Sequence, residues 1–273
     1  MLTTITDTAE RLARIPGVVG VTLGGSRARG AHRPDSDWDL GVYYRGTPDL
    51  AALRTLAGPD VEVAGPGEWG PWVNGGAWLT VDGTAVDWIL RDLDRVERVW
   101  ADCREGRYEV GVQAGHPLGF WSPCYAGELA LGQVLADPRG ELTALRAAMA
   151  HYPEALRTAL VGAAWEAGFL VASAGKGAAR GDVLHVSLCL SRAVGVLVQA
   201  LHAHDRRWCL NEKGALAATP PWFRDRAAAL LAAPGADPAA LAATLTAAGA
   251  LAADTAAALR EDALPDRGPL DTP

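Results

Sequence analysis

Two stretches decide the fold of this chain: GGSRARG at residues 24–30 and DSDWDLGVYY at residues 35–44. An apolar run precedes the first stretch, and ten residues separate Ser26 from Asp37. Alternate side chains of a strand share a face, so Asp37 and Asp39 are expected to point the same way. The pattern predicts a strand, a tight glycine-serine turn, and a second strand whose carboxylates lie beside that turn.

Two carboxylates next to a glycine-rich turn suit a divalent cation with a polyphosphate. Mg²⁺ prefers oxygen ligands, usually one or two carboxylates plus phosphates, and glycine lets backbone N–H groups approach phosphates closely. Arg27, Arg29 and Arg33 add positive charge here, which suits a triphosphate better than a long polyanion. Asp35 is expected to open the turn before the strand.

A later stretch of the chain repeats the layout of the strand that carries Asp39. Apolar runs at 77–81 and 84–90 flank Asp82-Gly83, a strong hairpin signal. In the second run Asp87 alternates with apolar residues, as Asp39 does in the earlier strand. Asp87 therefore occupies a position like that of Asp39, whereas Asp82 is assigned to the turn.

Through Gly25-Ser26, Asp37-x-Asp39 and this later carboxylate, the chain resembles the nucleotidyltransferase superfamily whose palm is shared with DNA polymerase beta. The resemblance implies an α+β fold, with an N-terminal palm built on a mixed β-sheet.

The resemblance also implies the composition of the site. Two Mg²⁺ ions would be held by Asp37, Asp39 and Asp87, which would also be the catalytic residues. The phosphates of ATP or another nucleoside triphosphate would lie against Gly25, Ser26 and Arg29.

The composition changes near residue 138, after which Ala and Leu follow a helical period. We predict a catalytic domain over 1–138 and an all-α helical bundle over 139–273 that binds substrate and nucleotide. The order of a long helix and Asn211-x-Lys213 resembles antibiotic adenylyltransferases of the aminoglycoside and lincosamide type. That resemblance implies that Lys213 reaches the nucleotide phosphates.

Asp182, Trp69 and Trp72 can each be interpreted in two ways. Asp182 precedes a long apolar helix, so it is either the N-cap or an acidic contact to a cationic substrate. Trp69 and Trp72 lie in a Gly/Pro/Trp-rich loop. They either stack on a base or sugar ring or anchor the loop. By strand alternation, Trp38 and Trp88 belong to the core.

The overall composition limits the kinds of partner and the cellular location that we expect for this chain. A net charge of −7 argues against a protein that covers duplex nucleic acid. Four cysteines without a Cys-x-x-Cys spacing, and no basic-then-apolar leader, indicate a cytoplasmic protein. Apolar stretches near 156–172 and 183–203 contain polar residues and are expected to be buried helices, not membrane spans.

The expected activity is Mg²⁺-dependent transfer of a nucleoside monophosphate, AMP from ATP, to a hydroxyl of a small molecule such as an aminoglycoside-like antibiotic. Two alternatives remain. One is a transferase that modifies a protein or RNA, as in toxin-antitoxin systems. The other is a non-catalytic nucleotide-binding module.

Overall fold

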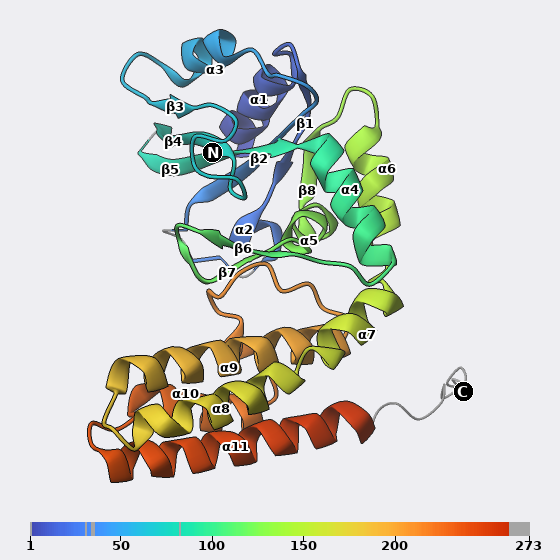
Figure 1. Ribbon diagram of the computed structural model, residues 1–273. Coiled ribbons are helices and arrows are strands. Elements are labelled where there is room, and N and C mark those ends of the chain that lie inside the picture. Colours follow the sequence, from blue (N-terminus) through green and yellow to red (C-terminus); the bar gives the residue numbers. More distant parts are fainter. Residues whose placement is uncertain (1, 31, 34–35, 82, 262–273) are drawn as a thin grey trace. The chain divides into compact units, whose positions relative to one another are not determined.

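A computed structural model describes residues 2–30, 32–33, 36–81 and 83–261 (Figure 1). Asp35 and Asp82, both assigned to turns from the sequence, lie outside these residues. The chain divides into two compact units, Met1–Leu156 and Arg157–Pro273. The composition change at residue 138 falls earlier than this division, because the helix that follows it packs against the first unit.

The first unit contains both helices and strands. In chain order these are α1 (Leu2–Ala13), β1 (Val18–Leu23), α2 (Gly25–Ala28), β2 (Trp38–Tyr44), α3 (Leu50–Ala57), β3 (Val63–Ala64), β4 (Gly75–Val81), β5 (Thr84–Asp92), α4 (Leu93–Arg104), β6 (Val110–Gln113), β7 (His116–Trp121), α5 (Cys124–Leu131), β8 (Gln133–Ala136) and α6 (Glu141–Met149).

Six of these strands form one mixed sheet in the order β3-β4-β5-β2-β1-β8. β2 and β5 pair in parallel, whereas β1–β2, β1–β8, β3–β4 and β4–β5 pair antiparallel. The two remaining strands, β6 and β7, form a separate hairpin. The first unit thus confirms the expected α+β class with a mixed sheet.

One face of the sheet forms the core of the first unit. Trp38 and Trp88 are 5% and 2% exposed, and they pack with Leu40 and Val86 from the same two strands. Side chains of α1 and α3 complete this apolar cluster. The prediction from strand alternation that Trp38 and Trp88 are buried is therefore confirmed.

The opposite face is divided between a covered end and a more open end. At the covered end, Arg91 on β5 donates to Glu128 on α5 at 2.6 and 2.8 Å. Tyr43, its register partner on β2, is also buried. Asp39 and Asp87 occupy the other end of this face, where both are half-buried.

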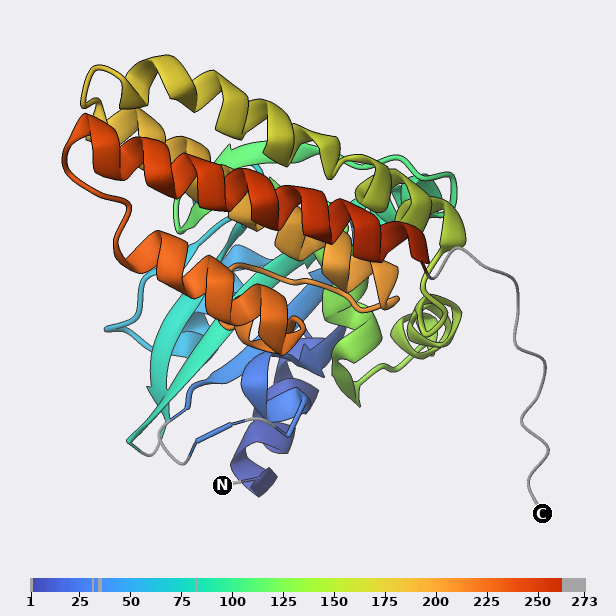
Figure 2. The ribbon, with the colours of Figure 1, turned by 90° about the horizontal axis from the view of Figure 1, so that it is seen from below.

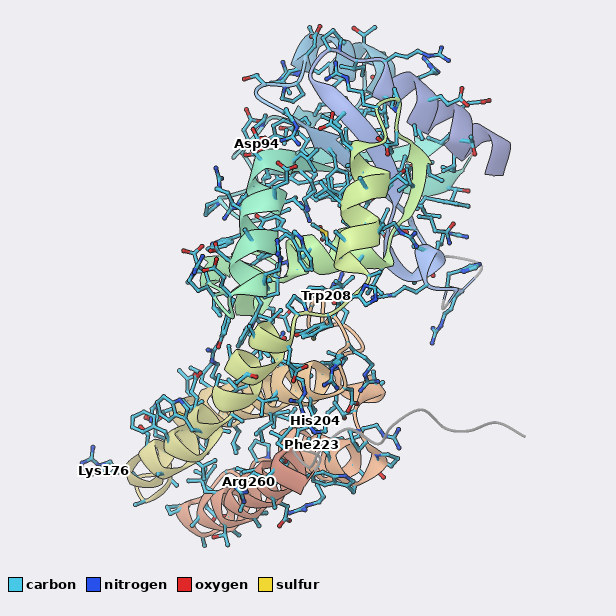
Figure 3. All side chains as sticks on the ribbon, turned by 90° about the vertical axis from the view of Figure 1, so that its right-hand side faces the viewer. Asp94, Lys176, His204, Trp208, Phe223 and Arg260 are labelled. Carbon is cyan, nitrogen blue, oxygen red and sulfur yellow. The ribbon has the colours of Figure 1, made fainter. Side chains whose placement is uncertain are left out.

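The second unit is helical and has its own apolar core, which includes Phe223 (Figure 3). Helices α8, α9 and α11 pack side by side (Figure 2). The helices, with one 3₁₀ turn η1, are α7 (Glu154–Gly162), α8 (Trp165–Ala178), α9 (Val183–His204), η1 (Leu216–Ala218), α10 (Pro221–Ala232) and α11 (Pro238–Glu261).

Three helical segments of this part of the chain are long and apolar enough to cross a membrane, judged by length and composition alone. They are Glu154–Ala178, Val183–His204 and Pro238–Arg260. This differs from the sequence-based expectation, in which scattered polar residues excluded a span. The expectation of buried helices fits Val183–His204 best, because half of its apolar window is buried, against 17% for Glu154–Ala178.

Candidate active site

Asp39 and Asp87 are brought together by the parallel pairing of β2 with β5. They are register partners, so their side chains leave the same face of neighbouring strands. Neighbouring strands lie about 4.8 Å apart, which places the two side chains next to each other. Two residues far apart in sequence thus form one pair of oxygen donors.

The glycine-serine turn lies directly against Asp39. The Gly24 N–H donates to the backbone carbonyl of Asp39 at 2.7 Å. Gly25 has φ +62, and a Cβ on it would lie 1.7 Å from Oδ2 of Asp39. Only glycine combines this backbone conformation with this close approach. The turn, including the half-buried Ser26, is therefore fixed beside the carboxylate.

Asp37 is exposed and lies immediately before Trp38, the first residue of β2. Arg27 of α2 holds the backbone there, since its Nε donates to the carbonyls of Ser36 at 3.0 Å and Asp37 at 3.1 Å. The Arg27 guanidinium also lies 4.4 Å from the centre of the Trp38 ring. Arg27 thus ties the start of β2 to the turn.

The described residues contain no group of three or more His, Cys, Asp or Glu side chains placed to hold a metal ion. The three predicted carboxylates are therefore not placed as one ligand group, and the pairing of β2 with β5, which begins after Asp37, brings together Asp39 and Asp87. The pair itself fits Mg²⁺, because this ion typically takes one or two carboxylates and completes its coordination with substrate phosphates and water.

The ring of Trp69 lies on this side of the sheet, next to Gly76 of β4. Its ring stacks on that of Trp78, with centroids 4.3 Å apart and an interplanar angle of 18°. Trp78 is the register partner of Asp87 and is 67% exposed. Of the two interpretations offered for Trp69, stacking on a ligand ring remains open, because this indole pair is available beside Asp87.

Trp72 has a different environment. Its ring stacks on Phe120 at 5.7 Å, and the guanidinium of Arg95 lies 4.6 Å from the ring centre. A Cβ on Gly111 would lie 1.9 Å from its indole nitrogen. These contacts support the anchoring interpretation for Trp72, while a contact with substrate stays a prediction.

One amide side chain fixes the loop between β3 and β4. Gln113 of β6 accepts from the N–H groups of Trp72 and Val73, both at 3.2 Å. Its Nε2 donates to the carbonyl of Trp69 at 2.7 Å. Because Gln113 is only 8% exposed, the loop is held from the interior of the first unit.

The remaining predicted residues lie at termini of helices or in loops. Arg29 is exposed and caps the C-terminus of α2. In the second unit, Asp182 accepts from the His185 N–H at 3.1 Å as the N-cap of α9. This confirms the cap interpretation, and a contact to substrate stays a prediction.

Lys213 is exposed in the loop after α9, and its N–H donates to Oδ1 of Asn211 at 2.9 Å. A side chain of α9 contacts this loop, because Nε2 of His202 lies 3.0 Å from the carbonyl oxygen of Ala215. Burial lowers the pKa of His202, which favours the neutral ring at this contact. A role for Lys213 at the phosphates stays a prediction.

Sequence reasoning missed Trp78 and Gln113, and it did not foresee Arg27 as a clamp. Trp78 had a usable signal: in a two-residue Asp-Gly hairpin it stands opposite Asp87. Gln113 offered no such signal, because its contacts lie some 40 residues away in sequence.

Two segments of the chain match known protein families. Residues 5–75 match the family described as a nucleotidyltransferase domain, and residues 127–213 match a domain of unknown function, DUF4037. No curated protein matched the chain. Among solved structures, it is similar to a nucleotidyltransferase-like protein from Exiguobacterium sibiricum 255-15, with 12% identity and a TM-score of 0.47 over 96% of this chain and 78% of that one.

The matched segment 5–75 contains Gly25, Ser26, Asp37 and Asp39. Asp87 lies beyond it and joins the site through the pairing of β5 with β2. Segment 5–75 is thus similar to nucleotidyltransferase domains, and the expectation of a transferase is confirmed.

Proposed function

We propose that the protein transfers a nucleoside monophosphate, AMP from ATP, to a hydroxyl group of a small molecule and releases pyrophosphate. The observation that carries this proposal is the in-register pair Asp39–Asp87 beside the Gly25 turn. It combines adjacent oxygen donors with a backbone open to phosphates, within and next to a matched nucleotidyltransferase segment.

In this reaction the acceptor oxygen forms a bond to the α-phosphorus. The bond between that phosphorus and the oxygen bridging to the β-phosphorus breaks, and pyrophosphate leaves with its electron pair. The hydroxyl proton passes to the carboxylate of Asp87 and then to solvent. Asp87 is suited to this because its side chain is half-buried on the open end of the sheet face.

Asp39 and Asp87 would hold Mg²⁺, and Asp37 would join them at the start of β2. When bound, Mg²⁺ would offset the negative charge of the phosphates and of the leaving pyrophosphate. The backbone of Gly24, Gly25 and Ser26 would orient the terminal phosphates. Positive charge from Arg29 and Lys213 would support them.

A small-molecule acceptor is favoured by the large helical unit, which a minimal transferase of protein or RNA does not need. A cationic acceptor of the aminoglycoside type suits the net charge of −7. Asp182 is an exposed carboxylate on the helical unit, available to such an acceptor. The cytoplasm is the expected location, because it supplies nucleoside triphosphates.

The test is transfer of label from α-labelled ATP, GTP, CTP or UTP, with Mg²⁺, to a panel of antibiotics and, separately, to cell extract. We expect a labelled small molecule with wild-type protein. In Asp39→Asn the rate is expected to fall by about 10³-fold, with the folded protein preserved. Measurement is by chromatography of the labelled products.

Asp60→Asn is the matched control, because Asp60 is an exposed carboxylate in the same unit and lies in the turn before β3, an edge strand of the sheet. Full transfer in Asp39→Asn would remove the site assignment. Label on a polypeptide or RNA in place of a small molecule would favour the modifying transferase. Absence of any transfer would favour a nucleotide-binding module.

A further inference from the structure

The geometry points to the stacked pair Trp69–Trp78 as the platform on which the acceptor binds, and to an acceptor that carries a sugar or aromatic ring with a flat apolar face. This inference rests on the proposed function and adds the chemistry of the second substrate. The nucleobase, the other candidate ligand for an aromatic platform, would lie with the phosphates on the other side of the carboxylates.

The first step is the position of the pair. Trp78 on β4 is the register partner of Asp87 on β5, so the two side chains leave the same face. Asp87 is in turn the register partner of Asp39 on β2. The Gly25 turn follows β1 and touches Asp39. Along the sheet the order is therefore turn, Asp39, Asp87 and indole pair.

The second step is the direction of the reaction. In phosphoryl transfer, the attacking and leaving oxygens lie roughly in line with the phosphorus between them. If the leaving pyrophosphate lies at the glycine-serine turn, the attacking hydroxyl must approach from the opposite side of the carboxylates. That side is β4, where Trp78 lies one strand, about 4.8 Å, beyond Asp87.

The third step is that the platform is already assembled. The backbone N–H of Trp69 donates to the carbonyl of Asn74 at 3.0 Å, and the backbone carbonyl of Trp69 accepts from Nε2 of Gln113 at 2.7 Å. A Cβ on Gly76 would lie 2.8 Å from the Trp69 ring. The missing side chain at Gly76 therefore leaves room for the ring of Trp69 close to the sheet. Because the ring is already in place, less ordering is needed on binding.

The fourth step is the chemistry of the platform. Trp78 is 67% exposed although it could bury a large apolar surface. An exposed indole face binds flat rings by stacking and attracts cationic groups through its π-electrons. With a carboxylate next to it, this face suits a ring that bears hydroxyl and ammonium groups.

The experiment compares Trp78→Ala with wild type, using the acceptor that the label-transfer panel identifies. We expect the KM for that acceptor to rise by about tenfold or more. The Kd for α,β-methylene-ATP with Mg²⁺, measured by calorimetry, should change by less than about twofold, since the nucleotide lies on the other side of the carboxylates. Trp78→Tyr should keep most of the affinity for acceptor.

Trp165→Ala is the matched control, because Trp165 is 69% exposed and lies on α8 of the helical unit. It should leave both constants unchanged. An unchanged acceptor KM in Trp78→Ala, or a raised Kd for the nucleotide analogue, overturns the inference while the proposed function stands. If wild-type protein transfers no label to any small molecule, the proposed function fails first and the inference falls with it.

Discussion

The two ends of one face of the sheet differ in how their charged side chains are arranged. On β2 and β5, the register pairs Asp39–Asp87 and Tyr43–Arg91 lie on the same face, four residues apart along each strand. At the Arg91 end the charge is buried and neutralised: Arg91 is 5% exposed and binds Glu128 through two nitrogens. At the Asp39 end, two like charges stand side by side, each half-buried.

The electrostatics of the covered end are those of a structural ion pair. Burial alone lowers the pKa of Arg91, but the carboxylate of Glu128 outweighs it, so the pKa is raised and the charge is kept. Burial also raises the pKa of Tyr43, which stays neutral. The arrangement joins α5 to the sheet.

At the Asp39–Asp87 end the two register partners carry charges of the same sign, and like charges opposite each other destabilise a sheet. The comparison teaches that the two ends serve different purposes. One stabilises the fold, whereas the other holds negative charge that a cation or a substrate can offset.

The largest effect is expected at the covered end. Arg91→Ala leaves Glu128 without its partner and should lower the free energy of unfolding by about 3–5 kcal/mol. Urea denaturation followed by circular dichroism measures this. The double variant Arg91→Met with Glu128→Leu should recover most of the loss, because neither charge then remains. A double variant as unstable as Arg91→Ala would show that the ion pair is not the cause.

A smaller effect is expected at the turn beside Asp39. Gly25→Ala places a Cβ 1.7 Å from Oδ2 of Asp39 and should displace the carboxylate, lowering the rate of nucleotidyl transfer by about 10²-fold. Gly30→Ala is the matched control: its φ is +67 and a Cβ would meet nothing within 4 Å. Both variants carry the same backbone strain, so equal losses in transfer would contradict a specific role for the contact with Asp39.

The smallest effect concerns the stability of the carboxylate pair. Without divalent cations, Asp87→Asn should raise the free energy of unfolding by about 0.2–1 kcal/mol, because it removes one of two like charges in register. Added Mg²⁺ should stabilise wild type more than the variant, since it binds the folded pair. Thermal unfolding with and without Mg²⁺ measures both. Equal Mg²⁺ responses would count against a cation site at Asp39 and Asp87.

The sequence was most informative where the signal was local. The apolar run before the glycine-serine turn is β1, and the runs at 77–81 and 84–90, which were expected to form a hairpin, lie within β4 and β5. Asp39 and Asp87 were placed on the correct face by alternation alone. Asp37 was expected within the strand and lies just before it, where Arg27 determines the backbone.

The features that escaped prediction depend on distant contacts. The partner of Arg91 lies 37 residues further along the chain, so no local pattern shows it. Strands β6 and β7 are short, with glycine at 111 and 119, and lack a clear alternation. Asp94, labelled in Figure 3, is another case, because it pairs with Arg45, which also binds Glu97 and Glu141.

Gln113 has a mechanical consequence for this part of the molecule. Its amide belongs to the β6–β7 hairpin, which is separate from the main sheet, yet it holds three backbone groups of the loop that carries Trp69 and Trp72. These three hydrogen bonds connect the hairpin to the loop. Local unfolding of the loop should therefore require the hydrogen bonds of the hairpin to break as well. We expect the amide protons of the loop to exchange with solvent at the rate at which the hairpin unfolds.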